Sequence, residues 1–179
     1  MNNFKSERKS VCVQGLGYVG AAMATAVAHA SDEEGNRIYD VVGIDLPDET
    51  GRYRVESIKR GNFPFATTDK KLISALNQAH VAGNITATTD ETILSKAEIV
   101  VVDVQLDLVF GEDESRLRFE EFEGAIRTIG QYVQPGTLIL IETTVPPGTC
   151  ANVVVPALDD ELVKRGFCEG GLLVAHSFE

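Results

Sequence analysis

Short apolar runs alternate along the chain with longer segments in which apolar residues recur every three or four positions. The short runs are continuous rather than mixed with polar residues, which is typical of parallel strands covered on both faces. They predict strands at Val11–Gln14, Val41–Ile44, Ile85–Thr88, Ile99–Val104, Leu138–Glu142 and Leu172–Ala175.

The longer segments have the period of amphipathic helices. In one of them Phe122, Ile126 and Ile129 share a face, and Pro135 prevents the helix from continuing. The predicted helices are Val19–His29, Tyr53–Arg60, Lys70–Ala82, Phe119–Val133 and Thr149–Arg165, with a brief one starting after Thr89 or Asp90.

The alternation of strands and helices predicts an α/β fold, a doubly wound (Rossmann-type) and mostly parallel sheet with helices on both faces. The polar segment Ser31–Tyr39 interrupts this order, and we expect a solvated loop or an extension of the first helix there. With 179 residues, 44% of them hydrophobic, the chain is expected to form a single domain over residues 1–179.

Composition narrows the classes of partner and compartment. The 16 basic and 27 acidic residues give a net charge of −11, which argues against a nucleic-acid or anionic-membrane surface. No apolar run approaches the ~20 residues of a membrane span, and the polar start is unlike a signal peptide. Cys12, Cys150 and Cys168 form no C-x-x-C pair, so a reduced, cytoplasmic protein without a metal site is expected.

The most informative motif follows the first predicted strand and opens the first helix. Gly15, Gly17 and Gly20 have the G-x-G-x-x-G spacing, with Tyr18 and Val19 between the last two. The first glycine permits a tight turn, the second lets the backbone approach a pyrophosphate, and the third lets helix and strand pack closely. These five residues are predicted to bind a dinucleotide; the alternative is a structural turn without a ligand.

A carboxylate at the end of the second strand indicates which dinucleotide binds. Asp45 would accept hydrogen bonds from the adenosine ribose hydroxyls and repel the 2′-phosphate of NADP, so NAD is predicted. Arg52 and Arg54 lie downstream, within reach of a phosphate in principle. We interpret them as exposed charges on a helix.

A second unusual stretch, "IETTVPPGT", occupies Ile141–Thr149. Thr143 and Thr144 stand at the carboxyl end of a predicted central strand, where open α/β sheets bind ligands. The alternative is a helix start, with proline near the first turn and Thr149 as the cap. The residues alone leave both interpretations open.

Taken in order, "GLGYVG", "VVGID", "RVESIKRGNFPF", "AGNITATTD", "IETTVPPGT" and "LLVAHSFE" resemble the UDP-glucose/GDP-mannose dehydrogenase family of nucleotide-sugar dehydrogenases. The resemblance covers residues 9–179 and corresponds to the N-terminal NAD-binding domain of that family. It implies oxidation of the C6 alcohol of a UDP- or GDP-sugar to a uronic acid, with two NAD and a thiohemiacetal and a thioester on a cysteine. Such an oxidoreductase serves polysaccharide biosynthesis.

The resemblance also implies roles for single residues. Thr144 matches the family's threonine that positions a water and the reacting groups, and it is also assigned to the cofactor site. Glu179 matches the family's acid–base glutamate. Arg54-Val55 matches the family's R-V, and Gly61–Pro64 its G-x-x-P element. Gln105 is assigned to the cofactor site from the loop after the fourth strand.

Two departures from the family pattern bear on the cofactor pocket. The family's V-x-T-P sequence is replaced across Val102–Leu108, the loop that carries Gln105, and Phe178 replaces a proline. We expect the pocket to survive with altered detail.

The catalytic cysteine of the family has no counterpart in this chain. Cys150 lies nearest the expected site, and a helix N-terminus can lower a thiol pKa, but the ordinary interpretation is a helix residue. The family's nucleophile, its substrate contacts and the helix through which it forms homodimers belong to a C-terminal half. This chain is therefore expected to be a fragment that binds NAD and is inactive alone. Two alternatives stay open: the cofactor domain of another 3-hydroxyacid-type dehydrogenase, and a non-catalytic dinucleotide-sensing module.

Overall fold

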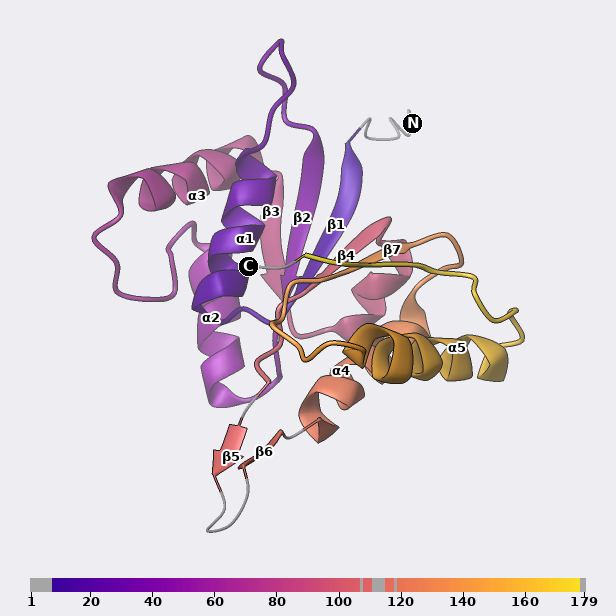
Figure 1. Cartoon of the computed structure of the whole chain (residues 1–179). Coiled ribbons are helices and arrows are strands. Elements are labelled where there is room, and N and C mark those ends of the chain that lie inside the picture. Colours follow the sequence, from indigo (N-terminus) through magenta and orange to yellow (C-terminus); the bar gives the residue numbers. More distant parts are fainter. Residues whose placement is uncertain (1–7, 107, 111–114, 118, 178–179) are drawn as a thin grey trace. The chain divides into compact units, whose positions relative to one another are not determined.

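Both halves of the chain are built from parallel strands joined by helices (Figure 1). The computed structural model describes residues 8–177, apart from 107, 111–114 and 118. The chain divides into two compact units, residues 1–89 and 90–179. Each is described by itself.

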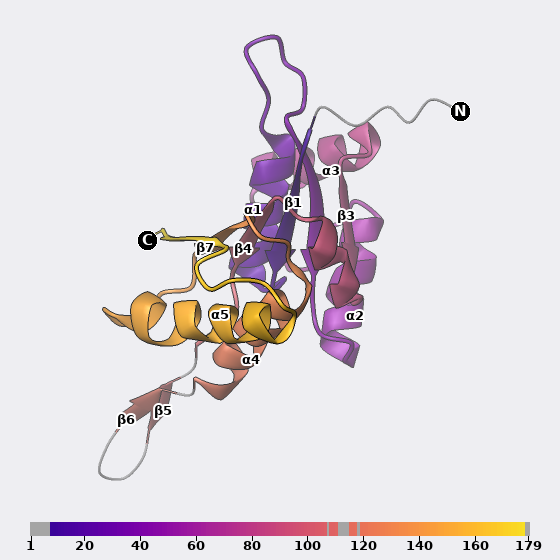
Figure 2. The same cartoon turned by 90° about the vertical axis from the view of Figure 1, so that its right-hand side faces the viewer.

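The first unit consists of β1 (Lys9–Gln14), α1 (Tyr18–His29), β2 (Tyr39–Ile44), α2 (Glu49–Lys59), α3 (Lys70–Ala82) and β3 (Ile85–Thr88). Its strands pair in parallel in the order β3-β2-β1. α1 packs against β2 and α3, and α2 packs against β3. Figures 1 and 2 both place α2 beyond the carboxyl ends of β1 and β2, the end at which parallel α/β sheets hold their ligands.

The second unit consists of a 3₁₀ turn (Glu91–Lys96), β4 (Ile99–Val102), β5 (Leu108–Phe110), β6 (Ser115–Leu117), α4 (Glu120–Tyr132), β7 (Leu138–Ile141), a π turn (Cys150–Val154), α5 (Val155–Lys164) and β8 (Leu173–His176). β4, β7 and β8 pair in parallel in that order, while β5 and β6 form a small antiparallel hairpin. α4 packs against α5, and Gly130 allows the close approach, because a Cβ there would lie 2.8 Å from the Cβ of Glu161.

Most predicted elements are confirmed, and α3 and β3 have the predicted bounds. The Asp69 carboxylate caps α3 by accepting the N–H groups of Lys71 (2.8 Å) and Leu72 (3.1 Å). Gly83 ends the helix in the left-handed conformation, with φ 73°. Residues 31–38 form a loop, closed by a bridge between Ser31 and Arg37, and Tyr39 begins β2, so the helix-extension alternative is wrong.

Several predicted boundaries are wrong for identifiable reasons. α2 begins four residues before Tyr53, because the Asp48 carboxylate caps it by accepting the N–H of Gly51 (2.7 Å). The last helix opens as a π turn, since Pro156 has no N–H to continue the α-helical bonds. The hairpin between β4 and α4 was not predicted. Within the described residues, every helix is too short or too polar to cross a bilayer.

β4 and β7 stop earlier than predicted, at Val102 and Ile141. The carbonyl of Val102 accepts both the Glu142 N–H (3.0 Å) and the Thr143 N–H (3.2 Å), which ends the regular ladder. The chain therefore leaves the strands just before the two loops that carry predicted site residues.

Candidate functional site

The glycine-rich turn connects β1 to α1 at the predicted position. Gly15 has φ 93°, a left-handed conformation that favours glycine, and its N–H donates to the Ile44 carbonyl at the end of β2 (2.9 Å). The Leu16 side chain is fully buried and packs on Gly43 of β2, where a Cβ would lie 2.6 Å from it. The turn is therefore anchored on β2 by one hydrogen bond and by the packing of Leu16.

Gly17 leaves the N-terminus of α1 open. A Cβ on Gly17 would meet no atom within 4 Å, so the space in front of this backbone is free for a ligand. Gly17 precedes α1, no side chain caps the helix, and its first turn carries no acidic residue. Gly20 is buried within α1, whereas Tyr18 and Val19 are exposed. Unpaired N–H groups and the positive helix end suit a pyrophosphate.

Asp45 lies just beyond the end of β2, and its N–H donates to the Thr88 carbonyl at the end of β3 (3.3 Å). Its carboxylate is 8% exposed and accepts two hydrogen bonds. Oδ1 accepts the N–H of Leu46 (2.8 Å), and Oδ2 accepts Nη1 of Arg54 (3.2 Å). A carboxylate can accept about four hydrogen bonds, which leaves capacity for ribose hydroxyls.

Arg54 is not the exposed charge that the sequence suggested. Its side chain is 27% exposed, pairs with Asp45, and lies over the ring of Phe65 at 5.4 Å. Arg52, two residues earlier on the same helix, is exposed as predicted. The helix face that carries Arg54 is therefore directed at the Asp45 carboxylate.

Three aromatic rings connect this carboxylate region to the glycine-rich turn. Tyr18 contacts Phe63 (5.4 Å between ring centroids) and Phe65 (5.7 Å), and its hydroxyl lies 3.3 Å from that of Thr67. Phe63 and Phe65 are 5.9 Å apart. The segment after α2 is thus held against the first residue of α1.

In the second unit, the two neighbouring threonines have different surroundings. Thr143 is buried, and its hydroxyl donates to the carbonyls of Val104 (2.8 Å) and Val102 (3.3 Å). Thr144 is exposed just after β7. Gln105 is exposed in the loop that Thr143 anchors. Thr149 stands at the N-cap position of the helical segment that begins at Cys150, as the helix-start alternative predicted, but its side chain makes no capping hydrogen bond.

Residues 9–177 match the model of the "UDP-glucose/GDP-mannose dehydrogenase family, NAD binding domain". The chain belongs to this family. The match includes both the glycine-rich turn and the Thr144 loop, and it confirms NAD as the cofactor and the resemblance inferred from the motifs.

Individual relatives agree with the family match. The chain is 29% identical over 160 residues to a UDP-N-acetyl-D-mannosamine dehydrogenase of Methanocaldococcus jannaschii, over 89% of this chain and 34% of the relative. It is 28% identical over 173 residues to a GDP-mannose 6-dehydrogenase of Pseudomonas putida, over 94% of this chain and 36% of the relative. The chain therefore spans about a third of the length of the curated relatives it matches.

A solved structure confirms the fold class. The crystal structure of an NDP-N-acetyl-D-galactosaminuronic acid dehydrogenase from Methanosarcina mazei superimposes with a TM-score of 0.82 at 26% identity, over 96% of this chain and 34% of that one. The predicted Rossmann-type fold is thus the fold of a family member.

The residues of the first unit fit NAD. The open space at Gly17, the uncapped start of α1 and the Asp45 carboxylate match a pyrophosphate and an adenosine ribose respectively. Gln14, 5% exposed beside this turn, has an Oε1 atom without a hydrogen-bond partner among the described residues. Glu179, predicted as an acid–base residue, lies outside the described residues.

Cys12 and Cys150 do not supply an activated thiol. Burial raises the pKa of Cys12 to about 12, and burial also raises that of Cys150. The possibility that a helix end lowers the Cys150 pKa is therefore wrong. Cys168 is exposed.

Sequence reasoning missed Phe63, Phe65 and the pairing of Arg54. The available signal was the F-P-F spacing, which allows two rings to meet Tyr18.

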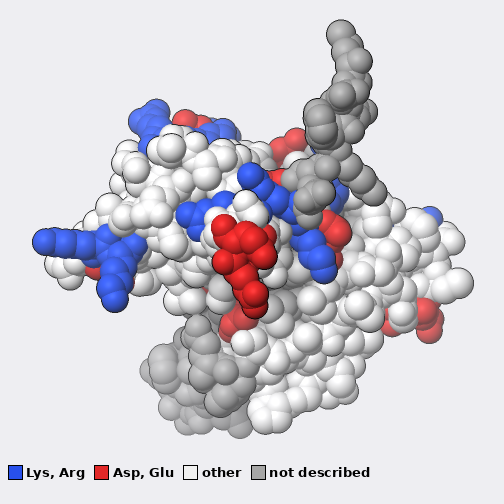
Figure 3. Space-filling model, turned by 90° about the horizontal axis from the view of Figure 1, so that it is seen from above, with Lys and Arg blue, Asp and Glu red and all other residues white. Residues whose placement is uncertain are grey.

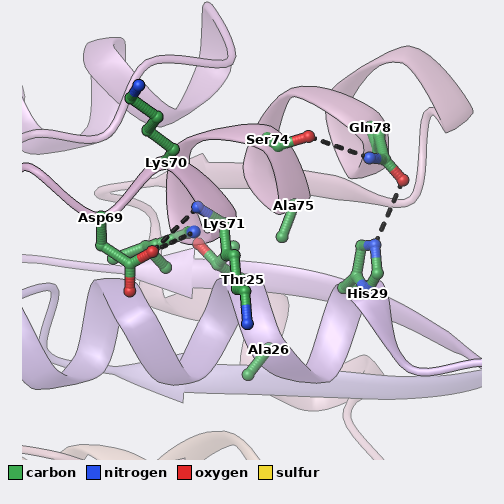
Figure 4. A pocket seen from close by; sticks show the side chains of 10 residues that line it. Thr25, Ala26, His29, Asp69, Lys70, Lys71, Ser74, Ala75 and Gln78 are labelled. Carbon is green, nitrogen blue, oxygen red and sulfur yellow. Dashed lines mark hydrogen bonds between the residues drawn. The ribbon is translucent and has the colours of Figure 1, made fainter.

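Two surface features lie apart from these residues. A groove between α1 and α3 is lined by residues such as His29, Lys71 and Gln78 and contains none of the predicted site residues (Figure 4). On the face in Figure 3, basic and acidic side chains form small mixed groups, so the net charge of −11 is not gathered there into one acidic patch.

Proposed function

We propose that this chain is the NAD-binding part of a nucleotide-sugar 6-dehydrogenase, which oxidises the C6 alcohol of a UDP- or GDP-sugar to the uronic acid with two NAD. The observation that carries the proposal is the family match over residues 9–177, which includes Thr144 as well as the glycine-rich turn. On this proposal the two units form one NAD-binding domain. The name of the M. jannaschii relative favours a UDP-sugar, and that of the P. putida relative a GDP-sugar.

We assign cofactor-binding, positioning and acid–base roles to different residues of the chain. The backbone at Gly15, Gly17 and the start of α1 binds the pyrophosphate, and Asp45 accepts hydrogen bonds from the adenosine ribose. The exposed Thr144 hydroxyl positions a water or the reacting groups, while Thr143 fixes the loop by its bonds to Val104 and Val102. NAD, when bound, accepts the hydride. Gln105 and Glu179 complete the proposed set as a cofactor contact and an acid–base group.

The second oxidation of the sugar requires a nucleophile that Cys12 and Cys150 do not provide. Cys12 and Cys150 have raised pKa values, and a thiolate is the reactive form of cysteine. We therefore propose that the nucleophile and the sugar contacts come from sequence beyond this third of the enzyme, and that the whole enzyme is a cytoplasmic homodimer.

The test compares this chain with a version extended to the length of its relatives. NADH formation is followed by absorbance with UDP-N-acetylmannosamine, UDP-glucose and GDP-mannose. We expect two NADH per sugar from the extended protein with one of these substrates, and none from the 179 residues alone. One NADH per sugar, or turnover by the short chain, would contradict the proposal.

Two isosteric substitutions separate the roles of the neighbouring threonines. Thr144→Val should lower kcat of the extended protein while leaving its melting temperature unchanged, because the side chain is exposed. Thr143→Val should lower stability by about 1 kcal/mol, because the Val104 carbonyl loses its donor. Unchanged kcat in Thr144→Val would remove Thr144 from the mechanism.

A further inference from the structure

Gln14 is the last residue of β1, and Gly15 of the glycine-rich turn follows it directly. In the parallel pairing of the first unit, Gln14 is the partner of Ile44, the last residue of β2, and Asp45 comes next after that strand. Gln14 and Asp45 therefore lie at the same carboxyl edge of the strands, the edge at which parallel α/β sheets bind their ligands.

The side-chain carbonyl of Gln14 is buried without a hydrogen-bond partner. The residue is 5% exposed, and its Oε1 atom, which is shielded from solvent, accepts no hydrogen bond from any described residue. An unsatisfied buried acceptor destabilises a fold, and most buried polar groups in proteins have a partner. The stability of the chain without a ligand therefore gives no reason for a glutamine at this position.

A second buried amide in the same unit has a structural role instead. Asn84 is 2% exposed and directly precedes β3, so it lies at the amino end of the strands, away from the glycine-rich turn. Its Oδ1 also lacks a partner among the described residues, but its Nδ2 donates to the carbonyls of Ala28 (2.7 Å) and Tyr39 (2.9 Å). These two hydrogen bonds join Asn84 to the end of α1 and to the start of β2.

The ligand expected at the carboxyl edge carries donors that could reach a buried acceptor there. The phosphate oxygens of a dinucleotide only accept hydrogen bonds, whereas its ribose hydroxyls donate as well as accept. We propose that Gln14 is a cofactor-binding residue, whose Oε1 accepts a hydrogen bond from a ribose hydroxyl of NAD. The acceptor is then satisfied only in the complex, so part of the affinity for NAD comes from relieving an unfavourable state of the free chain. The inference rests on the assignment of NAD as the cofactor, because it adds a contact to the same site.

This role predicts opposite effects of one substitution on stability and on affinity. Gln14→Met keeps the length of the side chain and removes the amide. Without NAD, the variant should melt about 2–8 °C higher than the unmodified chain, because it no longer buries an unsatisfied oxygen. Its dissociation constant for NAD⁺ should rise about five- to fiftyfold, because the ribose hydroxyl loses its acceptor. A residue with a purely structural role would not show both effects.

Asn84→Leu is the matched control at the other end of the strands. It should lower the melting temperature, because the carbonyls of Ala28 and Tyr39 lose their donor, and should leave the NAD⁺ affinity of the folded chain unchanged.

Fragments of the cofactor identify which ribose is bound. Dissociation constants of ADP, ADP-ribose and NAD⁺ are measured by calorimetry for the unmodified chain and for Gln14→Met, with no turnover required. If the substitution already weakens the binding of ADP, the adenosine ribose makes the contact. If the weakening first appears with ADP-ribose, the second ribose makes it.

The inference and the cofactor assignment fail in different ways. If the unmodified chain binds no NAD⁺, the assignment fails and the inference fails with it. If it binds NAD⁺ and Gln14→Met binds NAD⁺ equally well, the assignment stands and the role of Gln14 is refuted. A lower melting temperature of Gln14→Met without NAD, or a loss of affinity that is absent with ADP-ribose, also overturns the proposal. Gln14→Leu, which lacks the acceptor too, is measured in parallel and judged by the same criteria.

Discussion

Replacing Gly51 with alanine should destabilise the chain, although alanine is the better helix former. Gly51 is buried in the first turn of α2, and a Cβ there would lie 2.1 Å from the carbonyl oxygen of Leu46 and 3.0 Å from its carbon and nitrogen. These atoms are backbone, so they cannot rotate away as a side chain would. The helix or the 45–48 segment must move.

The magnitude follows from three contributions. Overpacking against fixed atoms costs about 1–3 kcal/mol. Movement of the helix start weakens the hydrogen bond from the Gly51 N–H to the Asp48 carboxylate (2.7 Å), a cap worth about 1 kcal/mol. Alanine has a higher helix propensity than glycine, which stabilises the variant by about 1 kcal/mol. The net loss is about 1–3 kcal/mol, which lowers the melting temperature of a chain of this size by about 2–12 °C.

Gly124→Ala is the matched control for this substitution. Gly124 is exposed within α4, and a Cβ there would meet nothing within 4 Å. The same chemical change should therefore stabilise the chain by about 0.5–1 kcal/mol. Both variants are measured by urea and thermal unfolding followed by circular dichroism without NAD. The reasoning is refuted if Gly51→Ala melts at or above the temperature of the unmodified chain.

Three other predictions test the site, the thiols and a charge network. Gly17→Ala should change stability by no more than about 1 kcal/mol and weaken NAD binding at least about tenfold, because its Cβ would occupy the open approach of the pyrophosphate; unchanged affinity in calorimetry would contradict this. A thiol reagent at mild alkaline pH should label Cys168 rapidly and Cys12 only on unfolding, since burial raises the Cys12 pKa to about 12; rapid labelling of both in the folded chain would be inconsistent. The hydrogen bond from Lys164 (2.6 Å) lowers the pKa of Glu161 in the folded chain. The ionised Glu161 side chain therefore stabilises the fold at pH values above its ordinary pKa of 4.5, and this stabilisation is lost as the pH falls below 4.5. The stability difference between the unmodified chain and Glu161→Gln, from urea titrations, should therefore narrow below that pH; a constant difference would argue against the network.

Local sequence signals predicted the elements whose ends depend on local chemistry. Lys70–Ala82 was predicted with its observed bounds because Asp69 is a strong cap and Gly83 adopts the left-handed conformation. The start of α2 was missed for the opposite reason. Gly51 resembles a helix breaker in the sequence, yet its role is to let the helix approach the Leu46 carbonyl, and no local pattern encodes that contact.

The site could also be predicted only where it depends on local sequence. The spacing of the glycines and Asp45 follows from what dinucleotide binding requires of a strand–turn–helix unit, so the motif can be recognised from the amino-acid sequence alone. The pairing of Arg54 with Asp45 depends on how α2 is placed beyond the strands, and the Phe65 platform depends on the path of the chain after α2. Both are tertiary contacts between residues 9 and 11 positions apart on different elements.

The peptide groups of Leu46 link these observations. The N–H of Leu46 holds the Asp45 carboxylate (2.8 Å), while its carbonyl is the atom that Gly51 approaches most closely. A displacement that relieves a Cβ at Gly51 must therefore move either the residue that orients Asp45 or the helix that carries Arg54. Gly51→Ala should consequently weaken NAD binding even at temperatures where the variant is fully folded, whereas Gly124→Ala should not. Equal NAD affinities of the two folded variants would show that the 45–48 segment absorbs the extra methyl group without changing the carboxylate, and that the position of α2 does not control the adenosine end of the site.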